Sequence, residues 1–200
     1  MKIIIIGGTG TIGSAVAKEL QSRHELILVG HSKGDITVDI TDVESIKKMY
    51  QKIGKFDAVI ATTGNVCFDE FSKMDAAKYQ IGLQSKLMGQ VNLVLIGYPH
   101  INDYGSFTLT SGILSQDPIK FGSSASMVNG AIDSFVKAAA IEMQRGIRIN
   151  VVSPTVITES MPAYESYFRG FPPVTAAKAA LAYSKSVEGL QTGQIYQVNY

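Results

Sequence analysis

Short apolar runs alternate with longer stretches of mixed polarity along this chain of 200 residues. The first run, residues 2–6, contains four consecutive isoleucines, which is typical of a strand buried on both faces of a parallel sheet. A glycine-rich turn follows directly, and residues 14–20 have the composition of a helix. The chain therefore begins with a predicted strand, turn and helix, and this order recurs downstream.

Further strands are predicted wherever a short apolar run is bounded by turn-forming residues. These runs lie at residues 25–29, 36–39, 58–61, 106–110, 147–152 and 194–198. Long helices are predicted at 75–96 and 126–143 and a short one at 176–183, and Thr41 and Glu44 have the spacing of a helix-opening capping box. Alternating strands and helices predict an α/β fold: a single doubly wound parallel sheet, Rossmann-like, with helices on both faces of one domain over residues 1–200.

Composition narrows the class of protein. The chain is 46% hydrophobic and 18% charged, with a formal net charge of +1 and no basic run, so nucleic acid is not an expected partner. Cys67 is the only cysteine, which rules out an intrachain disulfide and fits a reducing compartment. The first apolar run is too short for a signal peptide, and no run reaches the ~20 residues that span a membrane. We therefore expect a soluble cytoplasmic protein.

The glycine-rich turn carries the first candidate chemistry. Gly8, Gly10 and Gly13 fit the spacing G-x-G-x-x-G, and Gly7 with the last two fits G-x-x-G-x-x-G. Such a turn lets the backbone approach a pyrophosphate and aims the N–H groups of the next helix at it. A plain tight turn would use the same glycines, but the position between an apolar strand and a helix favours a dinucleotide site.

The order of the motifs resembles the short-chain dehydrogenase/reductase family over nearly the whole chain. The resemblance is carried by the glycine turn 7–13, by Asp39, and by the segments 61–64, 110–112, 145–154 and 192–195. It implies a nicotinamide dinucleotide cofactor. Because the chain is shorter than most members of that family, we expect trimmed loops and a short substrate lid near residues 155–173.

The resemblance also assigns cofactor contacts to the ends of the predicted strands. Contacts to the pyrophosphate would come from Gly7, Thr9, Gly10, Thr11, Ile12 and Gly13. Contacts to the adenine would come from Asp39 and Ile40. Contacts to the adenosine ribose and the middle of the cofactor would come from Thr62, Thr63 and Gly64. Contacts around the nicotinamide would come from Pro154, Thr155, Val156 and Thr158.

Ser111 falls where that family places its catalytic serine, whose hydroxyl hydrogen-bonds the reacting oxygen of the substrate. The alternative is a strand-end serine that bonds to the backbone. The family's Tyr-x-x-x-Lys pair is missing, since Ala125 stands at the tyrosine position and Asn129 at the lysine position. Alanine cannot exchange a proton, and asparagine cannot lower the pKa of a neighbour as a cation does.

Lys86 stands where the family commonly has an asparagine, in the long helix before the fifth strand. On this otherwise apolar helix it could project into the site, bind the nicotinamide ribose and exchange a proton. The alternative is a solvent-facing lysine, which is the fate of most lysines. Ser111 and Lys86 are the candidate catalytic residues.

The end of the second strand predicts the form of the cofactor. An acidic residue there would bond the ribose 2′-hydroxyl and repel a 2′-phosphate, but this chain has His31, Ser32 and Lys33, with no carboxylate before Asp35. We therefore expect NADP(H) to be preferred, with NAD(H) as the alternative.

Two functions fit these features. The first is an NADP(H)-dependent oxidoreductase that transfers a hydride between nicotinamide and a small carbonyl or alcohol substrate, with an altered catalytic set. The second is a non-catalytic NADP(H)-binding sensor or regulatory protein. By the resemblance, the two long helices would form the faces of a homodimer or homotetramer. The histidines lack metal-ligand spacing, so no metal is expected. The aromatic residues of the expected lid have three possible places. They would line a pocket for an apolar or aromatic substrate, form an oligomer contact, or belong to the core.

Overall fold

Every strand in the described part of the chain belongs to one parallel sheet. The computed structural model describes residues 1–199. Its sheet has the order β3-β2-β1-β4-β5-β6-β7, with each strand parallel to its neighbours. The strands are β1 (Lys2–Ile6), β2 (Glu25–Gly30), β3 (Ile36–Thr37), β4 (Phe56–Ala61), β5 (Ile101–Thr110), β6 (Arg148–Pro154) and β7 (Ile195–Val198). The strand order reverses between β1 and β4, which is where sheets of this kind bind their ligands.

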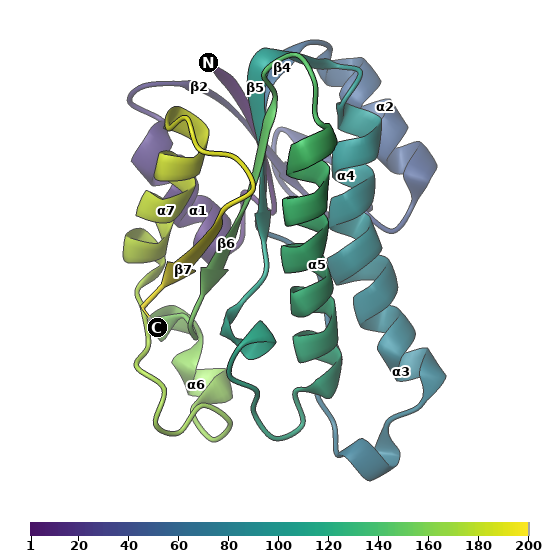
Figure 1. Ribbon diagram of the computed structural model, residues 1–200, viewed down its shortest axis with the longest axis vertical. Coiled ribbons are helices and arrows are strands. Elements are labelled where there is room, and N and C mark those ends of the chain that lie inside the picture. The colour runs from purple at the N-terminus through teal and green to yellow at the C-terminus, as the bar shows by residue number, and fades with distance from the viewer. Residues whose placement is uncertain (200) are drawn as a thin grey trace.

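Helices cover both faces of the sheet (Figure 1). On one face lie α1 (Thr11–Leu20) and α7 (Ala176–Glu188), and on the other lie α2 (Val43–Ile53), α4 (Gln90–Gly97) and α5 (Ser123–Glu142). The predicted doubly wound, Rossmann-like fold is confirmed. The short helices α3 (Ala76–Ile81) and α6 (Met161–Tyr164) lie at the end toward which the strands point (Figure 1). The remaining short turns are η1 (Phe71–Lys73), η2 (Gly82–Gly89), η3 (Ile113–Ser115) and η4 (Thr158–Ser160).

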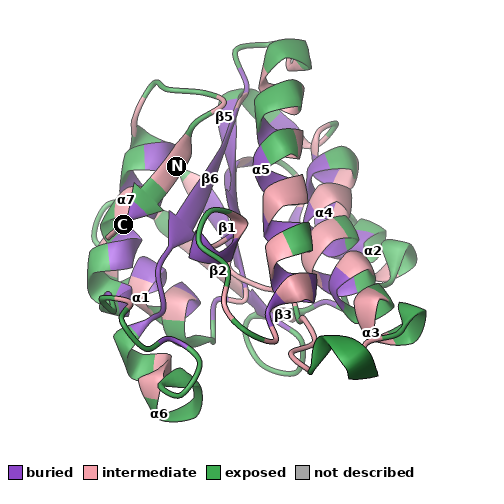
Figure 2. Ribbon diagram, turned by 60° about the horizontal axis from the view of Figure 1, so that its bottom comes forward, coloured by how far each residue is buried: buried purple, intermediate pink, exposed green. Residues whose placement is uncertain are grey.

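The isoleucine run of β1 joins two hydrophobic cores. Ile3 and Ile5 pack toward α1 and α7, whereas Ile4 and Ile6 pack toward α2, α4 and α5, and all four side chains are at most 1% exposed. Successive side chains of a strand point to opposite faces, so a strand between two helix layers must be apolar at every position. Figure 2 shows the central strands buried and the outer surfaces of the helices exposed.

One predicted helix start was wrong. Asp42, not Thr41, is the N-cap of α2, and its side chain accepts a hydrogen bond from the Glu44 N–H at 2.9 Å. The Thr41 hydroxyl instead donates to Asp39 Oδ1 at 2.7 Å. The carboxylate of Asp42 thus accepts the Glu44 N–H, which the Thr41 hydroxyl would accept in a capping box.

Three other elements differ in length or form from the prediction. The helix expected at 75–96 is continuous in course, but its middle, η2, is a π-helical turn. β5 begins five residues earlier than expected, because its exposed polar residues 102–104 break the apolar pattern. α7 continues to Glu188, beyond the expected end at 183, because its buried serines hide the apolar face; Ser186, for example, bonds Thr108 across 2.7 Å.

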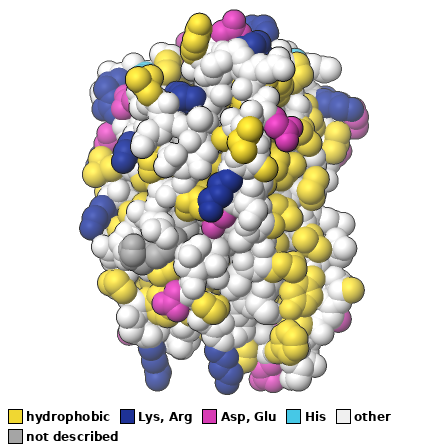
Figure 3. Space-filling model, viewed as in Figure 1, with side chains coloured by type: hydrophobic (Ala, Val, Ile, Leu, Met, Phe, Trp, Pro, Cys, Tyr) yellow, Lys and Arg dark blue, Asp and Glu magenta, His cyan; other side chains and the backbone are white. Residues whose placement is uncertain are grey.

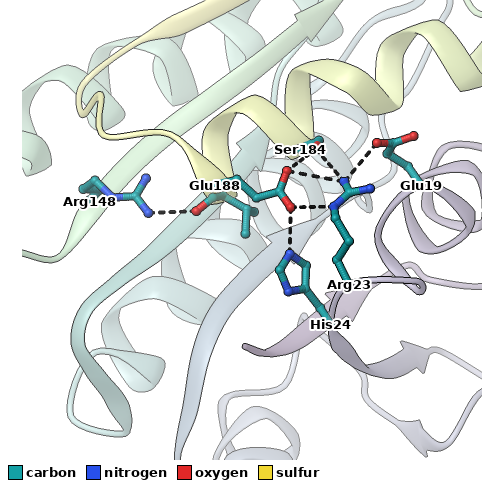
Figure 4. A network of polar contacts seen from close by, with 7 residues as sticks. Glu19, Arg23, His24, Arg148, Ser184 and Glu188 are labelled. Atoms are coloured by element: carbon teal, nitrogen blue, oxygen red, sulfur yellow. Dashed lines mark hydrogen bonds and ion pairs between the residues drawn. The ribbon is translucent and has the colours of Figure 1, made fainter.

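A network of charged side chains around Glu188, here called the Glu188 network, ties α7 to the turn between α1 and β2 (Figure 4). Arg23 donates to Glu188 at 2.8 Å and to Glu19 at 3.0 Å, and His24 Nε2 lies 2.9 Å from Glu188. Ser184 also donates to Glu188, at 2.7 Å. These hydrogen bonds, led by that from Arg23, lower the pKa of Glu188 to about 2. The network joins two helices on the same face of the sheet.

Candidate active site

The glycine turn after β1 forms a tight cradle at the switch point of the sheet. Gly7 has a φ of +81°, and a Cβ there would lie 2.6 Å from the Thr62 carbonyl oxygen. A Cβ on Gly13 would collide with the Gly7 carbonyl, whereas one on Gly10 would lie 3.3 Å from it. Gly7 and Gly13 are therefore required by the fold, and Gly10 faces outward beside the exposed Thr9 and Thr11.

The first turn of α1 offers backbone N–H groups to an anion. Its N-cap is Gly10, which has no side chain to cap the helix, and its first turn contains no acidic residue. Free N–H groups and the positive end of the helix dipole both favour a phosphate. Together with the cradle, this geometry fits the pyrophosphate of a dinucleotide.

A cavity of about 370 Å³ lies on the β2 and β3 side of the cradle. It brings together His31, Asp39, Ile40, Thr63 and Gly64, which the sequence placed on separate loops. Hydrogen bonds from the Thr41 hydroxyl and N–H to Asp39 lower the pKa of that carboxyl, so it is ionised at neutral pH. The cavity corresponds to the expected adenine side.

The other predicted residues on this side lie outside the cavity lining. Ser32 and Lys33 are exposed in the turn after β2. Thr62 lies beneath Gly7, and its hydroxyl donates to the Ile6 carbonyl at 3.1 Å.

A second cavity, of about 230 Å³, lies across Gly64 from the first and is here called the reaction cavity. Its polar side chains include Lys86, Ser111, Asn129 and Thr155. Apolar side chains make up most of the remaining wall, namely Ile12, Val66, Phe68, Ile113, Leu114, Ala125, Val156, Ile157 and Phe168. A few convergent polar groups in an apolar cavity are typical of small-molecule sites.

Ser111 lies at the end of β5 with its hydroxyl free. Its N–H donates to the Val152 carbonyl at 3.0 Å, and the residue is 6% exposed. Its Oγ has no hydrogen-bond partner among residues 1–199, which excludes the alternative of a serine bonded to the backbone. A buried hydroxyl without a partner is costly to fold, so it is a candidate to bind a ligand.

Lys86 lies on the π-helical turn η2, is half-buried and lines the reaction cavity. Burial lowers the pKa of its ammonium group to about 8, although the negative charge of Asp133 acts in the opposite direction. A lysine with such a pKa can both give and accept a proton near neutral pH.

Gln90 joins the segments that carry these two residues. Its side-chain amide donates to the Lys86 carbonyl at 3.1 Å and to the Thr110 carbonyl at 2.9 Å. Its carbonyl oxygen accepts from the Thr110 N–H at 2.8 Å. Gln90 is fully buried. It therefore fixes the backbone under Lys86 relative to the strand end that holds Ser111.

A family model described as enoyl-(acyl carrier protein) reductase matches residues 9–190. The chain belongs to the short-chain dehydrogenase/reductase family. It is similar to the short-chain dehydrogenase/reductase ATR9 of Stachybotrys chlorohalonatus, with 28% identity over 76% of this chain and 72% of that protein. It is also similar to a tropinone reductase homolog of Arabidopsis thaliana, with 25% identity over 80% of this chain and 71% of that protein.

Solved structures agree with this membership. The protein lin1944 from Listeria innocua is 54% identical, with 99% of both chains covered and a TM-score of 0.98. A small-chain dehydrogenase in complex with NADPH is 26% identical, with 100% of this chain and 96% of that chain covered and a TM-score of 0.89.

Within this short-chain dehydrogenase/reductase, the positions of the expected tyrosine and lysine also line the reaction cavity. They hold Ala125, which is 3% exposed, and Asn129, whose amide donates weakly to the Gly112 carbonyl at 3.4 Å. Neither side chain titrates, so Lys86 and Tyr164 are the titratable side chains among the described residues that line the cavity.

The segment after β6 covers the reaction cavity. Pro154, Thr155, Val156 and Ile157 line it, and Tyr164 with Phe168 closes it from α6 and the following turn. Phe168 also packs edge-on against Phe171, with ring centroids 5.4 Å apart.

Thr158 lies outside the lining of the reaction cavity. It is exposed, and its N–H donates to the Val174 carbonyl at 2.8 Å.

Sequence reasoning missed two polar residues that flank the site, Gln90 and Asp133. Asp133 is only 5% exposed and occurs four residues after Asn129 on the apolar face of α5. A single acidic residue on an otherwise apolar helix face was the signal available for it.

Among the described residues, 1–199, no group of three or more histidine, cysteine or acidic side chains could hold a metal ion. No helix there is both long and apolar enough to cross a membrane.

Proposed function

We propose that this protein is an NADP(H)-dependent oxidoreductase that transfers a hydride between nicotinamide and a small carbonyl or alcohol substrate. Ser111 and Lys86 are its catalytic residues, in place of the family's tyrosine and lysine pair. The observation that carries this proposal is the convergence of a free hydroxyl and a half-buried lysine in one cavity beside the glycine cradle.

The bound cofactor supplies or accepts the hydride at the substrate carbon. In the direction of reduction, Ser111 donates a hydrogen bond to the carbonyl oxygen and orients it. Lys86 gives its proton to that oxygen as negative charge develops there, so an N–H bond breaks and an O–H bond forms. With a pKa of about 8, Lys86 is mostly protonated at neutral pH and recovers its proton from water after each cycle.

The turn after β2 supports a preference for NADP(H). Lys33 and Ser32 are exposed there, where a 2′-phosphate would find a positive charge and a hydroxyl donor. The carboxylate of Asp35 accepts a hydrogen bond from the Leu28 N–H at 2.8 Å, which holds it against β2. The similarity to a dehydrogenase crystallised with NADPH agrees with this preference.

The test is NADPH oxidation with a panel of small aldehydes and ketones, using wild type, Lys86→Met and Ser111→Ala. We expect turnover by wild type and a loss of turnover in both variants, with melting temperatures that do not fall. Methionine keeps the length of lysine and removes its charge, so it isolates the ammonium group. Lys185→Met, an exposed change on α7, is the control and should turn over as wild type does. Full activity in Lys86→Met would remove Lys86 from the mechanism.

A second candidate function is a non-catalytic NADP(H) sensor. The observation that favours it is the non-titrating pair Ala125 and Asn129 at the positions of the usual proton relay. Tight NADPH binding without turnover of any carbonyl or alcohol would decide for the sensor.

We further propose a homodimer or homotetramer formed through α4 and α5. A groove of about 460 Å³ lies between them, lined by apolar residues such as Val94, Leu95 and Phe135. Leu95 is 59% exposed. Hydrophobic side chains gather on the side of the molecule where α3 and α4 lie (Figure 3). Light scattering should show a multiple of the 21.5 kDa chain mass, and Leu95→Glu should reduce it to the monomer.

A further inference from the structure

Asp133 is an acidic residue enclosed by protein and without a partner. It lies in the middle of α5, is 5% exposed, and neither carboxylate oxygen has a hydrogen-bond partner among residues 1–199. Its neighbours on the same helix face include Asn129, Ile132 and Val136, all buried. An ionised carboxylate in such a place is destabilising unless a positive charge compensates for it.

Lys86 is the compensating charge that the structure offers. The turn η2 that carries it packs against α5, and Asn129, one turn before Asp133 on the same buried face, lines the reaction cavity together with Lys86. The negative charge of Asp133 raises the pKa of Lys86. The two do not touch, since Asp133 has no hydrogen bond or ion pair within the described part of the chain. Their attraction therefore acts without a direct contact, and because Asp133 is nearly enclosed by protein, its charge is weakly screened.

The other titratable groups near Lys86 do not replace Asp133. Tyr164 of the lid lines the same cavity, and His31 and Asp39 line the adjoining one across Gly64. Burial lowers the pKa of Lys86, and Asp133 is the group whose charge raises it. Without that carboxylate, more of Lys86 would be a neutral amine at neutral pH.

We propose that Asp133 is a positioning residue that keeps Lys86 protonated and thereby able to act as the proton donor. This inference rests on the proposed function of Lys86. It assigns a role to a residue outside the cavity wall that acts only through its charge. The carboxylate neither binds the substrate nor takes up the transferred proton.

The experiment measures the pKa of Lys86 directly, in the cofactor-free protein, by NMR of ¹³Cε-labelled lysine. The Lys86 signal is the one missing from the spectrum of Lys86→Met. In Asp133→Asn, which keeps the shape and removes the charge, we expect the pKa to fall below the wild-type value of about 8 by roughly one pH unit. Glu142→Gln removes an exposed carboxylate from the same helix and should leave it unchanged.

A second variant guards against misfolding of the first. Asp133→Leu replaces the unpartnered carboxylate by an apolar side chain of similar branched shape, which removes the charge without leaving a polar group to satisfy. It should lower the pKa of Lys86 in the same direction. An unchanged or higher pKa in either variant overturns the proposal. Failure of both to fold also counts against it, because a residue that acts only on the proton of Lys86 is dispensable for folding.

Turnover separates this inference from the function on which it rests. In Asp133→Asn, the rate of carbonyl reduction should begin to fall at a lower pH than in wild type, with kcat affected and KM unchanged. A purely structural role would lower the rate equally at every pH. If the pKa of Lys86 falls as expected but no variant, wild type included, turns over a substrate, the pairing stands and the oxidoreductase proposal fails.

Discussion

The Glu188 network and the reaction cavity differ in how many of their polar groups have hydrogen-bond partners. In the network, Glu188 receives hydrogen bonds from Arg23 and Ser184 and lies within 2.9 Å of His24. In the cavity, the hydroxyls of Ser111 and Thr155 and the nearby carboxylate of Asp133 have no hydrogen-bond partner among residues 1–199. The side chains of Arg23 and Glu188 are 42% and 33% exposed, so their charges are solvated at little cost, whereas the cavity groups are nearly enclosed. His24 is the exception in the network, because its Nδ1 is buried without a partner among residues 1–199.

The difference separates stability from function. Paired groups at the surface join α1 to α7 and contribute modestly to folding. Unpaired groups in an enclosed site destabilise the folded chain and are retained where a ligand completes their hydrogen bonds. Mutations in the two regions should therefore have opposite consequences, which four experiments can test.

The largest effect is expected at the glycine cradle. Gly10 has a φ of −83° and a ψ of 177°, which valine can adopt, and a Cβ there lies 3.3 Å from the nearest atom. Gly10→Val should therefore fold, but its side chain would occupy the space of the pyrophosphate and abolish NADPH binding. Calorimetric titration measures the binding. Gly130→Ala, where a Cβ meets nothing within 4 Å, is the matched control and should bind normally.

Ser111→Ala should lower kcat by about 100-fold, the usual cost of removing one donor to a developing oxyanion. Its melting temperature should stay the same or rise, because the variant no longer buries a hydroxyl without a partner. Stopped-flow kinetics measures kcat, and calorimetric melting measures the melting temperature. A large loss of stability would mean that Ser111 is a structural residue, and the contrast with the network would disappear.

Lys33→Ala should weaken NADPH binding by roughly tenfold and leave NADH binding unchanged, since it removes one charged contact to the 2′-phosphate. Titration of both cofactors at one ionic strength checks this. Lys18→Ala, an exposed lysine on α1, serves as the control. Tighter binding of NADH than of NADPH by wild type would contradict the expected preference.

Glu188→Gln should have the smallest effect, a loss of about 1 kcal/mol in the free energy of unfolding with kcat unchanged. The pKa of Glu188 is lowered in the folded protein, so its ionised form stabilises the fold above the unfolded pKa. That contribution is lost as the pH falls from about 4.5 toward about 2. The difference in melting temperature between wild type and variant should therefore narrow over this range. If the difference in melting temperature stays constant down to pH 2, the negative charge of Glu188 does not contribute to stability.

Some of the site could be read from local patterns. Glycine spacing predicted the cradle, and the strand ends predicted the residues that now line two adjoining cavities, among them Asp39, Gly64 and Ser111. Asp133 and Gln90 were missed, because nothing in the sequence nearby says what a helix residue packs against. The capping box at Thr41 failed because the carboxylate of the adjacent Asp42 accepts the Glu44 N–H in place of the Thr41 hydroxyl.

The sequence by itself determined the parallel sheet, the helices on its two faces and the tight glycine turn after β1. These depend on hydrophobic periodicity and on glycine geometry, which act between residues close together in the chain. Only the tertiary structure decided that Lys86 faces a cavity and that Ser111 and Asp133 lack partners near it. Burial and pairing are properties of the space between η2, β5 and α5, and segments so far apart in the chain define that space only once they pack together.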